Sequence, residues 1–314
     1  MANLGYVQVT RACNQTCRFC SNPPSGLEIG VEEACRRVDD LAERRFAGVI
    51  LTGGEPTLVP WLPEVVRHAT ARGLAPRIIT NGQRLADGPL LDALAAAGLR
   101  HVHVSIHSHD PAVHDAIART EGSHARAARA LARIGERRGL TADVNCVIHR
   151  YNAGALDRFA AFVVERFPRV RHLVFNNLDT RMSRVAENPD TVPRLADLEI
   201  SLAGALRHLE AHGRTFRVER VPLCYMAEWA HCSTETRKIV KGEERVVHFL
   251  DEKGVVRQRD RAFVHAKGPA CAACRLDPIC AGLDGGPESP AQAGLYPVFV
   301  DPDEVAARIR RDPD

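Results

Sequence analysis

The sequence predicts an α/β fold: an open, partial (β/α)6 barrel of the TIM type, followed by a small α+β domain. Two observations support this. The first two-thirds of the chain alternates short β-rich runs with helical runs, which is typical of βα units around a parallel sheet. The strand candidates also alternate apolar with polar side chains. One face of the sheet can therefore pack under helices, while the other would line a wet cavity rather than a packed barrel interior.

Six strands with intervening helices are expected in this part of the chain. The strand candidates are residues 6–10, 48–52, 76–80, 101–106, 142–148 and 172–176. The helical patterns are VEEACRRVDDLAERR, LPEVVRHATAR, GPLLDALAAAGL, HARAARALARIGERR and GALDRFAAFVVERF. Right-handed crossovers between parallel strands would curl these units into a barrel or a partial barrel.

The character of the chain changes after about residue 180. A loop and a helix lead to the strand candidate FRVER, and RVVHFLDEKGVVRQ is typical of a hairpin with Glu252, Lys253 and Gly254 near its turn. A cysteine group, a Gly/Pro-rich stretch and a short helix follow. We therefore expect two domains, residues 1–214 and residues 215–314.

Composition narrows the class of protein. Hydrophobic residues make up 45% and charged residues 26% of the 314 residues, and the net charge is +3. This charge is too small for the basic face of a dedicated nucleic-acid binder. No apolar run is long enough to span a membrane, and the N-terminus lacks a signal-peptide pattern. We expect a cytoplasmic protein, in which clustered cysteines are more often metal ligands or catalytic residues than disulfides.

An N-terminal cysteine triplet follows the first strand. Residues 11–20 read RACNQTCRFC, with the spacing Cys-x3-Cys-x2-Cys. Three thiolates so close in sequence can surround one inorganic centre. A zinc site would need a distant fourth ligand, whereas a 4Fe–4S cube held by three cysteines leaves one iron open. The spacing alone allows both.

The loop CNQTCRFC resembles the signature of the radical S-adenosylmethionine (SAM) superfamily, with Phe19 in the aromatic position. LTGGEP (51–56) follows the second strand, where that family carries a Gly-Gly-Glu-Pro motif, and TNG (80–82) ends the third. The resemblance covers about residues 5–180. It implies a partial (β/α)6 barrel in which Cys13, Cys17 and Cys20 bind a 4Fe–4S cluster.

The resemblance also implies a SAM site. The amino and carboxylate groups of SAM would chelate the open iron, and Gly53, Gly54 and Glu55 would bind the amino group. Glycines allow a close backbone approach, and a carboxylate pairs with an ammonium. Further contacts would come from Phe19 and Val147 at the adenine and from Asn81 and Ser105 at the ribose or carboxylate, with loop capping or core packing as the alternative for Asn81, Ser105 and Val147.

The implied chemistry is reductive cleavage of SAM to a 5′-deoxyadenosyl radical, which abstracts a hydrogen from the substrate. A flavodoxin or ferredoxin would supply the electron. The substrate would be a peptide, a natural-product intermediate or a sugar, and the enzyme an oxidoreductase, an epimerase or a peptide-modifying maturase. Two alternatives remain: a non-catalytic iron–sulfur or zinc binding protein, and an RNA-modifying radical SAM enzyme.

A second cysteine group, CAACRLDPIC (271–280), could bind a metal centre together with Cys224. The four thiolates of Cys224, Cys271, Cys274 and Cys280 suit a 4Fe–4S cluster or structural zinc. The pattern resembles the SPASM/twitch extension of radical SAM enzymes. Asp284 stands where the full pattern has another cysteine, so we expect one auxiliary 4Fe–4S cluster.

The remaining candidates have weaker support. Cys232 could replace Cys224, donate a hydrogen in the active site or simply pack, and Tyr225 is a second catalytic candidate. Cys35 and Cys146 are expected in the core. The run HVHVSIHSHD is expected to line the barrel, with His107 and His109 near the substrate at the carboxyl end of the strand; a mononuclear metal site, for which His-x-His is a common ligand pair, is the alternative. Polar residues expected near the cavity or on the surface are Asp179, Arg181, Glu235 and the basic group Arg237, Lys238 and Lys241.

Overall fold

One mixed sheet organises the molecule. The computed structural model describes residues 3–180, 183–251, 254–258, 263–283 and 294–312. Within these residues nine strands pair in the order β7-β6-β5-β4-β3-β2-β1-β8-β9. All neighbours are parallel except β8 and β9. The strands are β1 Leu4–Thr10, β2 Gly48–Gly53, β3 Ala75–Thr80, β4 His101–Ser105, β5 Thr141–Ile148, β6 His172–Asn177, β7 Thr215–Glu219, β8 Arg245–His248 and β9 Val255–Gln258.

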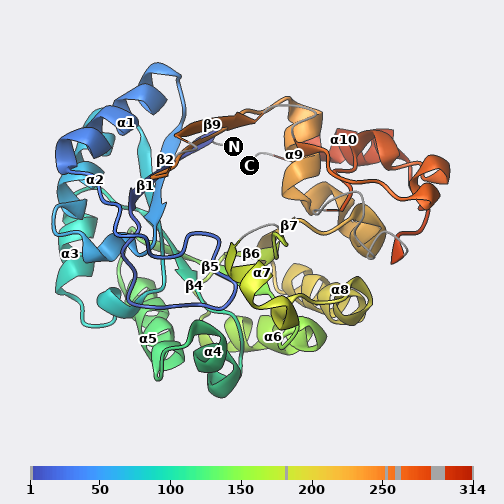
Figure 1. Ribbon diagram of the computed structural model, residues 1–314, viewed down its shortest axis with the longest axis horizontal. Coiled ribbons are helices and arrows are strands. Elements are labelled where there is room, and N and C mark those ends of the chain that lie inside the picture. The colour runs from blue at the N-terminus through green and yellow to red at the C-terminus, as the bar shows by residue number, and fades with distance from the viewer. Residues whose placement is uncertain (1–2, 181–182, 252–253, 259–262, 284–293, 313–314) are drawn as a thin grey trace.

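The helices that follow the strands lie along the outer face of the curved sheet (Figure 1). They are α1 Val31–Glu43, α2 Leu62–Ala71, α3 Pro89–Ala96, α4 Pro111–Ala118, α5 Ser123–Glu136 and α6 Leu156–Arg166. The later helices are α7 Ser183–Glu187, α8 Leu195–Ala211, α9 Thr234–Lys241 and α10 Pro302–Arg311. This order of strands and helices confirms the predicted α/β class, and the six predicted strands correspond to β1 to β6.

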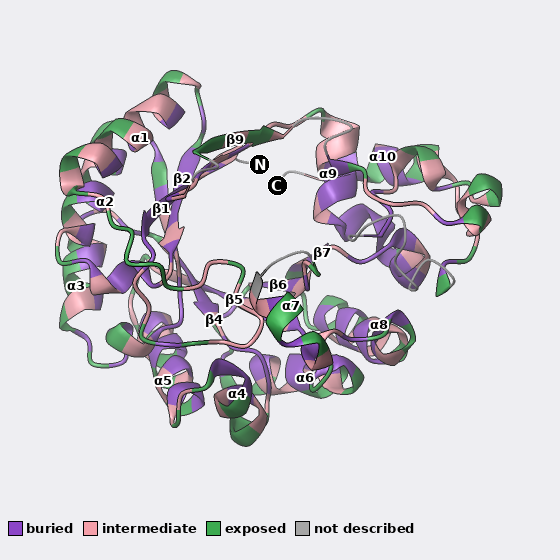
Figure 2. Cartoon of the chain, viewed as in Figure 1, coloured by how far each residue is buried: buried purple, intermediate pink, exposed green. Residues whose placement is uncertain are grey.

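The core lies between the sheet and these helices. Val102, Val104, Val144 and Cys146 on β4 and β5 are fully buried, and the helices are coloured as buried mainly where they face the sheet (Figure 2). Their alternation with polar neighbours matches the parity seen in the sequence. The polar side chains of the same strands face the concave side of the sheet, where they line a cavity.

The sheet remains open, with β7 at one edge and β9 at the other. The FRVER segment forms β7 beside β6, and the predicted hairpin forms β8 and β9, with β8 beside β1. Glu252 and Lys253 of its turn lie outside the described residues, as do Arg181 and Asp284. Residues 215–258 thus extend the sheet at both edges, and the division at residue 215 stays a prediction. None of the described helices has the length and apolar character needed to cross a membrane.

Two surface expectations were wrong. Glu235 and Arg237 on α9 are both buried, with exposed fractions of 7% and 2%. The Arg237 guanidinium lies 2.9 Å from an Asp312 carboxylate oxygen, and Glu235 accepts a hydrogen bond from the Arg220 N–H. Because α10 packs on α9, this polar face is covered by protein rather than by water, and these two charged groups find partners inside the molecule.

Candidate functional site

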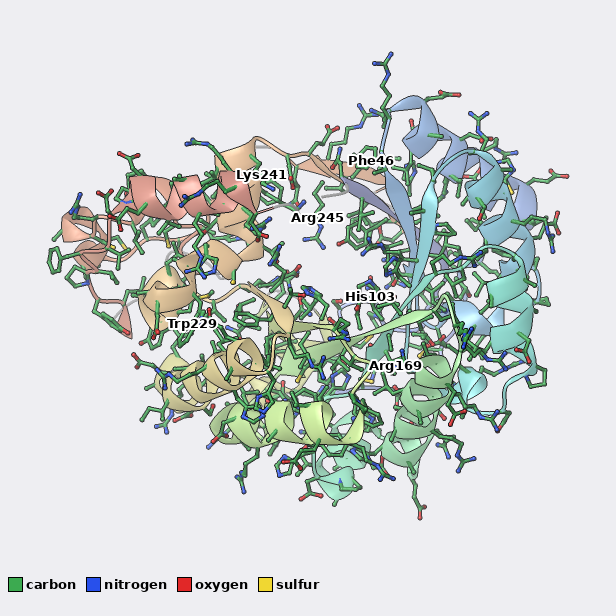
Figure 3. The ribbon with its side chains drawn as sticks, turned by 180° about the vertical axis from the view of Figure 1, so that it is seen from behind. Phe46, His103, Arg169, Trp229, Lys241 and Arg245 are labelled. Atoms are coloured by element: carbon green, nitrogen blue, oxygen red, sulfur yellow. The ribbon has the colours of Figure 1, made fainter. Side chains whose placement is uncertain are left out.

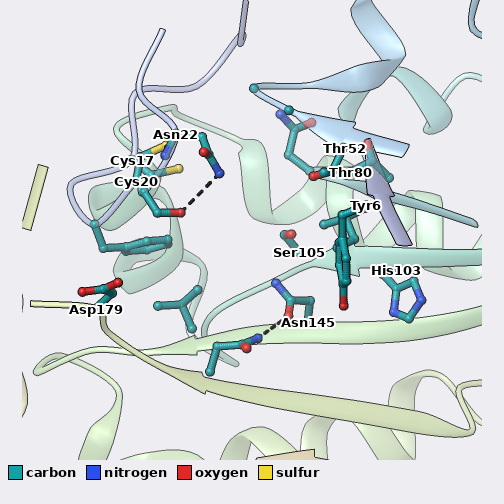
Figure 4. A pocket seen from close by; sticks show the side chains of 18 of the residues that line it. Tyr6, Cys17, Cys20, Asn22, Thr52, Thr80, His103, Ser105, Asn145 and Asp179 are labelled. Atoms are coloured by element: carbon teal, nitrogen blue, oxygen red, sulfur yellow. Dashed lines mark hydrogen bonds between the residues drawn. The ribbon is translucent and has the colours of Figure 1, made fainter. Parts of the chain in front are cut away.

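A cavity of about 390 Å³ occupies the concave side of the sheet. It lies at the carboxyl ends of the strands, where ligands of open parallel sheets bind. Figure 4 shows Cys17 and Cys20 on the loop after β1, across the cavity from Thr52, Thr80, Ser105 and Asn145. Every residue that the sequence assigned to the cluster or to SAM lines this one cavity: Cys13, Cys17, Phe19, Cys20, Gly53, Gly54, Glu55, Asn81, Ser105 and Val147.

The three cysteines of the loop suit a cationic centre. Burial raises the pKa of the Cys13 thiol to about 11. Burial, and then the neighbouring Cys20 and Cys13, raise the pKa of Cys17 as well. Thiols in such surroundings are poor isolated anions, and a bound cation would be needed to hold them as thiolates. The backbone N–H groups of Gln15 and Asn22 donate to the sulfurs of Cys13 and Cys20 at 3.4 and 3.3 Å.

The arrangement differs from that of a single-ion site. Among the described residues, no group of three or more His, Cys, Asp or Glu side chains gathers closely enough to hold one metal ion. In a 4Fe–4S cube each thiolate binds a different iron, so the sulfurs need not converge on one point. Three thiols that line one cavity therefore fit a cluster, and the cavity leaves room for a ligand beside them.

Gly53 and Gly54 bring β2 against the cysteine loop. A Cβ atom on Gly53 would lie 2.2 Å from the Thr10 carbonyl oxygen, and one on Gly54 would lie 2.2 Å from that of Ala12. Gly53 also has a φ of +145°, which side chains rarely allow. The Gly54 N–H donates to the Thr10 carbonyl at 2.7 Å. The glycines thus allow a close approach of the chain to itself, in addition to lining the cavity as the sequence predicted.

The Glu55 carboxylate joins two strand ends. Its Oε1 accepts hydrogen bonds from the Thr57 N–H, the Thr57 hydroxyl and the Thr80 hydroxyl, at 3.0, 2.6 and 2.7 Å. Its Oε2 accepts one from the Asn81 N–H at 2.7 Å. Burial raises the pKa of Glu55, although these bonds oppose the rise. Each carboxylate oxygen offers about two lone-pair sites, and Oε2 accepts only one of these bonds, so Oε2 keeps capacity for an ammonium group.

The adenine candidate Phe19 lies against two buried histidines: His107, which the sequence predicted to lie near the substrate, and His149, which it did not single out. The ring of Phe19 stands edge-on to His107, with centroids 4.9 Å apart, and stacks on His149 at 6.0 Å. His107 Nδ1 accepts from the Val147 N–H at 3.2 Å, which places its hydrogen on Nε2. The signals available in the sequence were positions at strand ends: His107 stands two residues after β4, and His149 directly follows β5.

An arginine between the last two cysteines anchors the loop to a distant segment. The Arg18 guanidinium donates to both Asp190 carboxylate oxygens, at 2.8 and 2.7 Å, and to Asn188 at 3.3 Å. The Tyr151 hydroxyl accepts from it at 3.3 Å. The sequence did not reveal this network, because the partners of Arg18 lie more than 130 residues away from it along the chain.

The C-terminal cysteines surround a second, much smaller space of about 20 Å³. Its lining includes Cys224, Cys271, Cys274 and Cys280. The N–H groups of Gly282 and Val298 donate to the sulfurs of Cys280 and Cys274, each at 3.3 Å. Lys267 donates to the Cys280 carbonyl at 2.7 Å. The four thiols that the sequence grouped are therefore neighbours in space.

The other candidates lie elsewhere. Cys232 does not line either space; its sulfur is 3.2 Å from His231 Nε2. The Tyr225 hydroxyl donates to the Gly294 carbonyl, and Tyr225 does not line the barrel cavity. A catalytic role for either stays a prediction. Asp179 does line the barrel cavity.

The barrel and its cysteine loop define a family. Residues 7–163, half of the chain, match the model of the radical SAM superfamily. This protein therefore belongs to the radical SAM superfamily, whose members use SAM and a 4Fe–4S cluster.

Similar proteins are known at the level of sequence. The chain is 39% identical over 164 residues to a PqqA peptide cyclase of Xanthomonas campestris pv. campestris, covering 51% of this chain and 43% of the relative. It is 33% identical over 162 residues to a PqqA peptide cyclase of Ruegeria pomeroyi, covering 50% and 43%. The match thus spans less than half the length of these curated relatives.

Solved structures share the fold. SuiB of Streptococcus suis bound to SAM superposes with a TM-score of 0.67 at 15% identity, over 90% of this chain and 73% of SuiB. HydG of Carboxydothermus hydrogenoformans, an FeFe-hydrogenase maturase, gives a TM-score of 0.56 at 14% identity, over 74% and 57%. At these identities the likeness concerns the partial barrel and not the reaction.

Proposed function

We propose that this chain is a radical SAM enzyme that modifies a peptide. The observation that carries the proposal is the single cavity lined by the cysteine triplet, the Gly53–Gly54 turn and Glu55. The peptide substrate is favoured by the names of the relatives, PqqA peptide cyclases. In addition, SuiB bound to its precursor peptide SuiA has the same fold, with a TM-score of 0.66.

In this proposal Cys13, Cys17 and Cys20 hold the cluster, and Glu55 accepts a hydrogen bond from the SAM ammonium. When bound, the cluster and SAM supply an electron transfer that breaks the C5′–S bond and provides a 5′-deoxyadenosyl radical.

The chain's own residues orient and shield this chemistry. Phe19 packs beside the adenine, and His107, which lines the cavity and whose Nδ1 is held by the Val147 N–H, carries its hydrogen on Nε2, from which it can be donated. Asn81 is less available than the sequence suggested, because its amide donates to Asn14 and its carbonyl oxygen accepts from the Gln83 N–H. Its main contribution is then to hold the cysteine loop through Asn14, while its backbone N–H donates to the Glu55 carboxylate.

The second part of the proposal concerns the C-terminal cysteines. We propose that Cys224, Cys271, Cys274 and Cys280 hold one auxiliary 4Fe–4S cluster in a SPASM/twitch-like segment. With four protein thiolates such a cluster has no open iron, so it would relay electrons or stabilise the segment. A flavodoxin- or ferredoxin-type protein would deliver the electrons.

Anaerobic reconstitution tests the proposal. Two cubes predict about eight irons per chain, and dithionite with SAM should yield 5′-deoxyadenosine. A peptide encoded beside the gene, deuterated at its Cα and side-chain carbons, should transfer deuterium into that product. Zinc in place of iron, or the absence of SAM cleavage, would overturn the enzymatic function; cleavage without deuterium transfer from the peptide would overturn the substrate class.

A further inference from the structure

The inner end of the barrel cavity lies away from the cysteines and has no part in the proposed SAM site. Tyr6 from β1, His103 from β4 and Arg245 from β8 line it. Figure 4 shows Tyr6 and His103 on the opposite side of the cavity from Cys17 and Cys20. We call this inner end, defined by these three residues, the cavity floor.

Arg245 reaches the floor because β8 pairs with β1. Its guanidinium carbon lies 5.0 Å from the centre of the Tyr6 ring, which is within the range of a cation–π contact. Its Nε is buried and has no hydrogen-bond partner among the described residues. Figure 3 shows Arg245 and His103 toward the inside of the barrel. A guanidinium is always ionised, so an unmatched one lining a cavity is suited to an anionic ligand.

A second arginine increases the positive charge beneath the floor. Arg77 on β3 also has a buried Nε without a partner among the described residues. After burial, its charge contributes to lowering the pKa of His103, to about 3. His103 is therefore neutral and adds no positive charge, but its ring nitrogens can still form hydrogen bonds. Its Nε2 is 3.6 Å from an Asp143 oxygen, too far for a good hydrogen bond.

The acidic residues nearby do not cancel these charges. Burial raises the pKa of Asp143 to about 7, against the opposing influence of Arg77. Burial likewise raises the pKa of Glu235, which is close enough to Arg245 to interact with it, to about 7. Burial thus favours the neutral form of both carboxyl groups. Glu219, which lines the cavity, also acts on Arg245 with its charge, but it lies 3.8 Å from the Arg220 guanidinium as well, so its negative charge is shared between two arginines.

We propose that the cavity floor is a subsite for a substrate carboxylate, bound by the Arg245 guanidinium with His103 as a neutral hydrogen-bonding neighbour. This rests on the proposed function, because it describes which part of the peptide enters the barrel. A carboxylate matches the two-pronged donor geometry of arginine. Glu219 would repel a second negative charge, so a singly charged carboxylate fits better than a phosphate dianion.

Binding of small probes tests the subsite in the reconstituted full-length protein. The probes are N-acetyl-L-glutamate N-methylamide, its neutral glutamine analogue, N-acetyl-L-alanine and inorganic phosphate, titrated by ligand-observed NMR at pH 7.5. We expect a carboxylate probe to bind at least about tenfold more tightly than the glutamine analogue. Tighter binding of the glutamate probe assigns an acidic side chain, and tighter binding of N-acetyl-L-alanine assigns a C-terminal carboxylate; both support the subsite.

Variants identify the residue responsible. Arg245→Gln should lower the affinity for the preferred carboxylate probe by about tenfold or more. Arg245→Lys keeps the positive charge but loses the two-pronged donor geometry of arginine, so its affinity should lie between that of Arg245→Gln and that of the unmodified protein. Arg169→Gln is the matched control, because Arg169 is an exposed arginine (Figure 3). Melting curves and iron content verify folding, and Arg245→Lys serves if Arg245→Gln does not fold.

Three results would overturn the subsite: equal binding of the glutamine analogue, unchanged binding by both Arg245 variants, or tighter binding of phosphate than of either carboxylate. Absence of binding by every probe would also overturn it. The test is separate from that of the proposed function. SAM cleavage without carboxylate binding removes only the subsite, whereas carboxylate binding without SAM cleavage removes only the proposed function.

Discussion

The two cysteine sites of this protein use the same side chain in different surroundings. Three cysteines lie at the wall of a cavity of about 390 Å³, whereas four surround a space of about 20 Å³. The first has fewer thiols than a cube needs and room for another ligand. The second has a full set and no such room. The number of thiols and the space beside them therefore distinguish the two sites. The first is suited to a cluster that also binds a small ligand, and the second is suited to a cluster held by protein thiolates alone.

The two sites are also supported differently. The barrel loop depends on distant partners, such as the β2 glycines and the Arg18 contact with Asp190. The C-terminal site combines a short turn, in which the Cys274 N–H donates to the Cys271 carbonyl at 3.0 Å, with its own distant partner, the Val298 N–H on the Cys274 sulfur. Because the two sites have different partners, loss of a distant partner of the barrel loop should affect the barrel site and leave the other intact.

The largest expected effect is the loss of SAM cleavage in Cys17→Ala. The remaining two thiols cannot hold the cube, so about four of eight irons should be lost and 5′-deoxyadenosine should fall to background. Iron analysis and chromatography of the product measure both. Cys35→Ala is the control, because this half-buried cysteine of α1 lies outside the cavity. Normal cleavage by Cys17→Ala would contradict the assignment.

The second prediction concerns Cys271→Ala in the C-terminal site. About four irons should again be lost, but SAM cleavage with dithionite should persist, because the barrel cavity is unchanged. The same assays apply. Cys232→Ala should keep all the iron, since its sulfur lies beside His231 and not in the C-terminal space. Iron loss in Cys232→Ala would make Cys232 a ligand in place of Cys224.

Acid should weaken the barrel region through its buried histidines. Burial lowers the pKa of His149 to about 3, while the unfolded chain titrates near about 6.5. As the pH is lowered below about 6.5, the unfolded state binds the proton before the folded state does. The free energy of unfolding therefore decreases as the pH decreases. Between pH 6.5 and 5.5 this histidine should cost about 1 kcal/mol.

The variant His149→Asn isolates this contribution. Its side-chain oxygen can replace Nδ1 as the acceptor of the Tyr151 N–H but does not titrate. Urea denaturation at both pH values should show a decrease about 1 kcal/mol smaller in the variant than in the unmodified protein. Equal pH dependence of the two proteins would show that His149 is protonated when folded.

The smallest effect is expected from Arg18→Gln. Its ion pair with Asp190 is partly exposed, and such pairs contribute little. Iron release to a chelator from the barrel site should be faster by less than about tenfold, with release from the C-terminal site unchanged. Arg36→Gln, which removes an exposed pair with Glu33, is the control. Faster release from the C-terminal site would show that the two sites are coupled.

Much of the barrel was predictable, because it is encoded in local patterns. Alternation along β4 and β5 identified the face that packs under helices, and the spacing of Cys13, Cys17 and Cys20 pointed to one inorganic centre. The burial of Glu235 and Arg237 was not predictable, because it depends on α10, which packs on α9 from more than 60 residues away. A charged side chain on a short helix carries no local sign that another helix covers it.

The sequence by itself determined the family, the order of strands and helices, and the cysteines that belong together. Those features follow from short-range spacing and from the two-residue period of a strand. Only the tertiary structure decided that β8 lies beside β1 and so brings Arg245 over Tyr6. It also decided that Gly53 and Gly54 pack against the loop that carries the cysteines. Both depend on backbone pairing between distant segments, which is governed by the packing of the whole sheet.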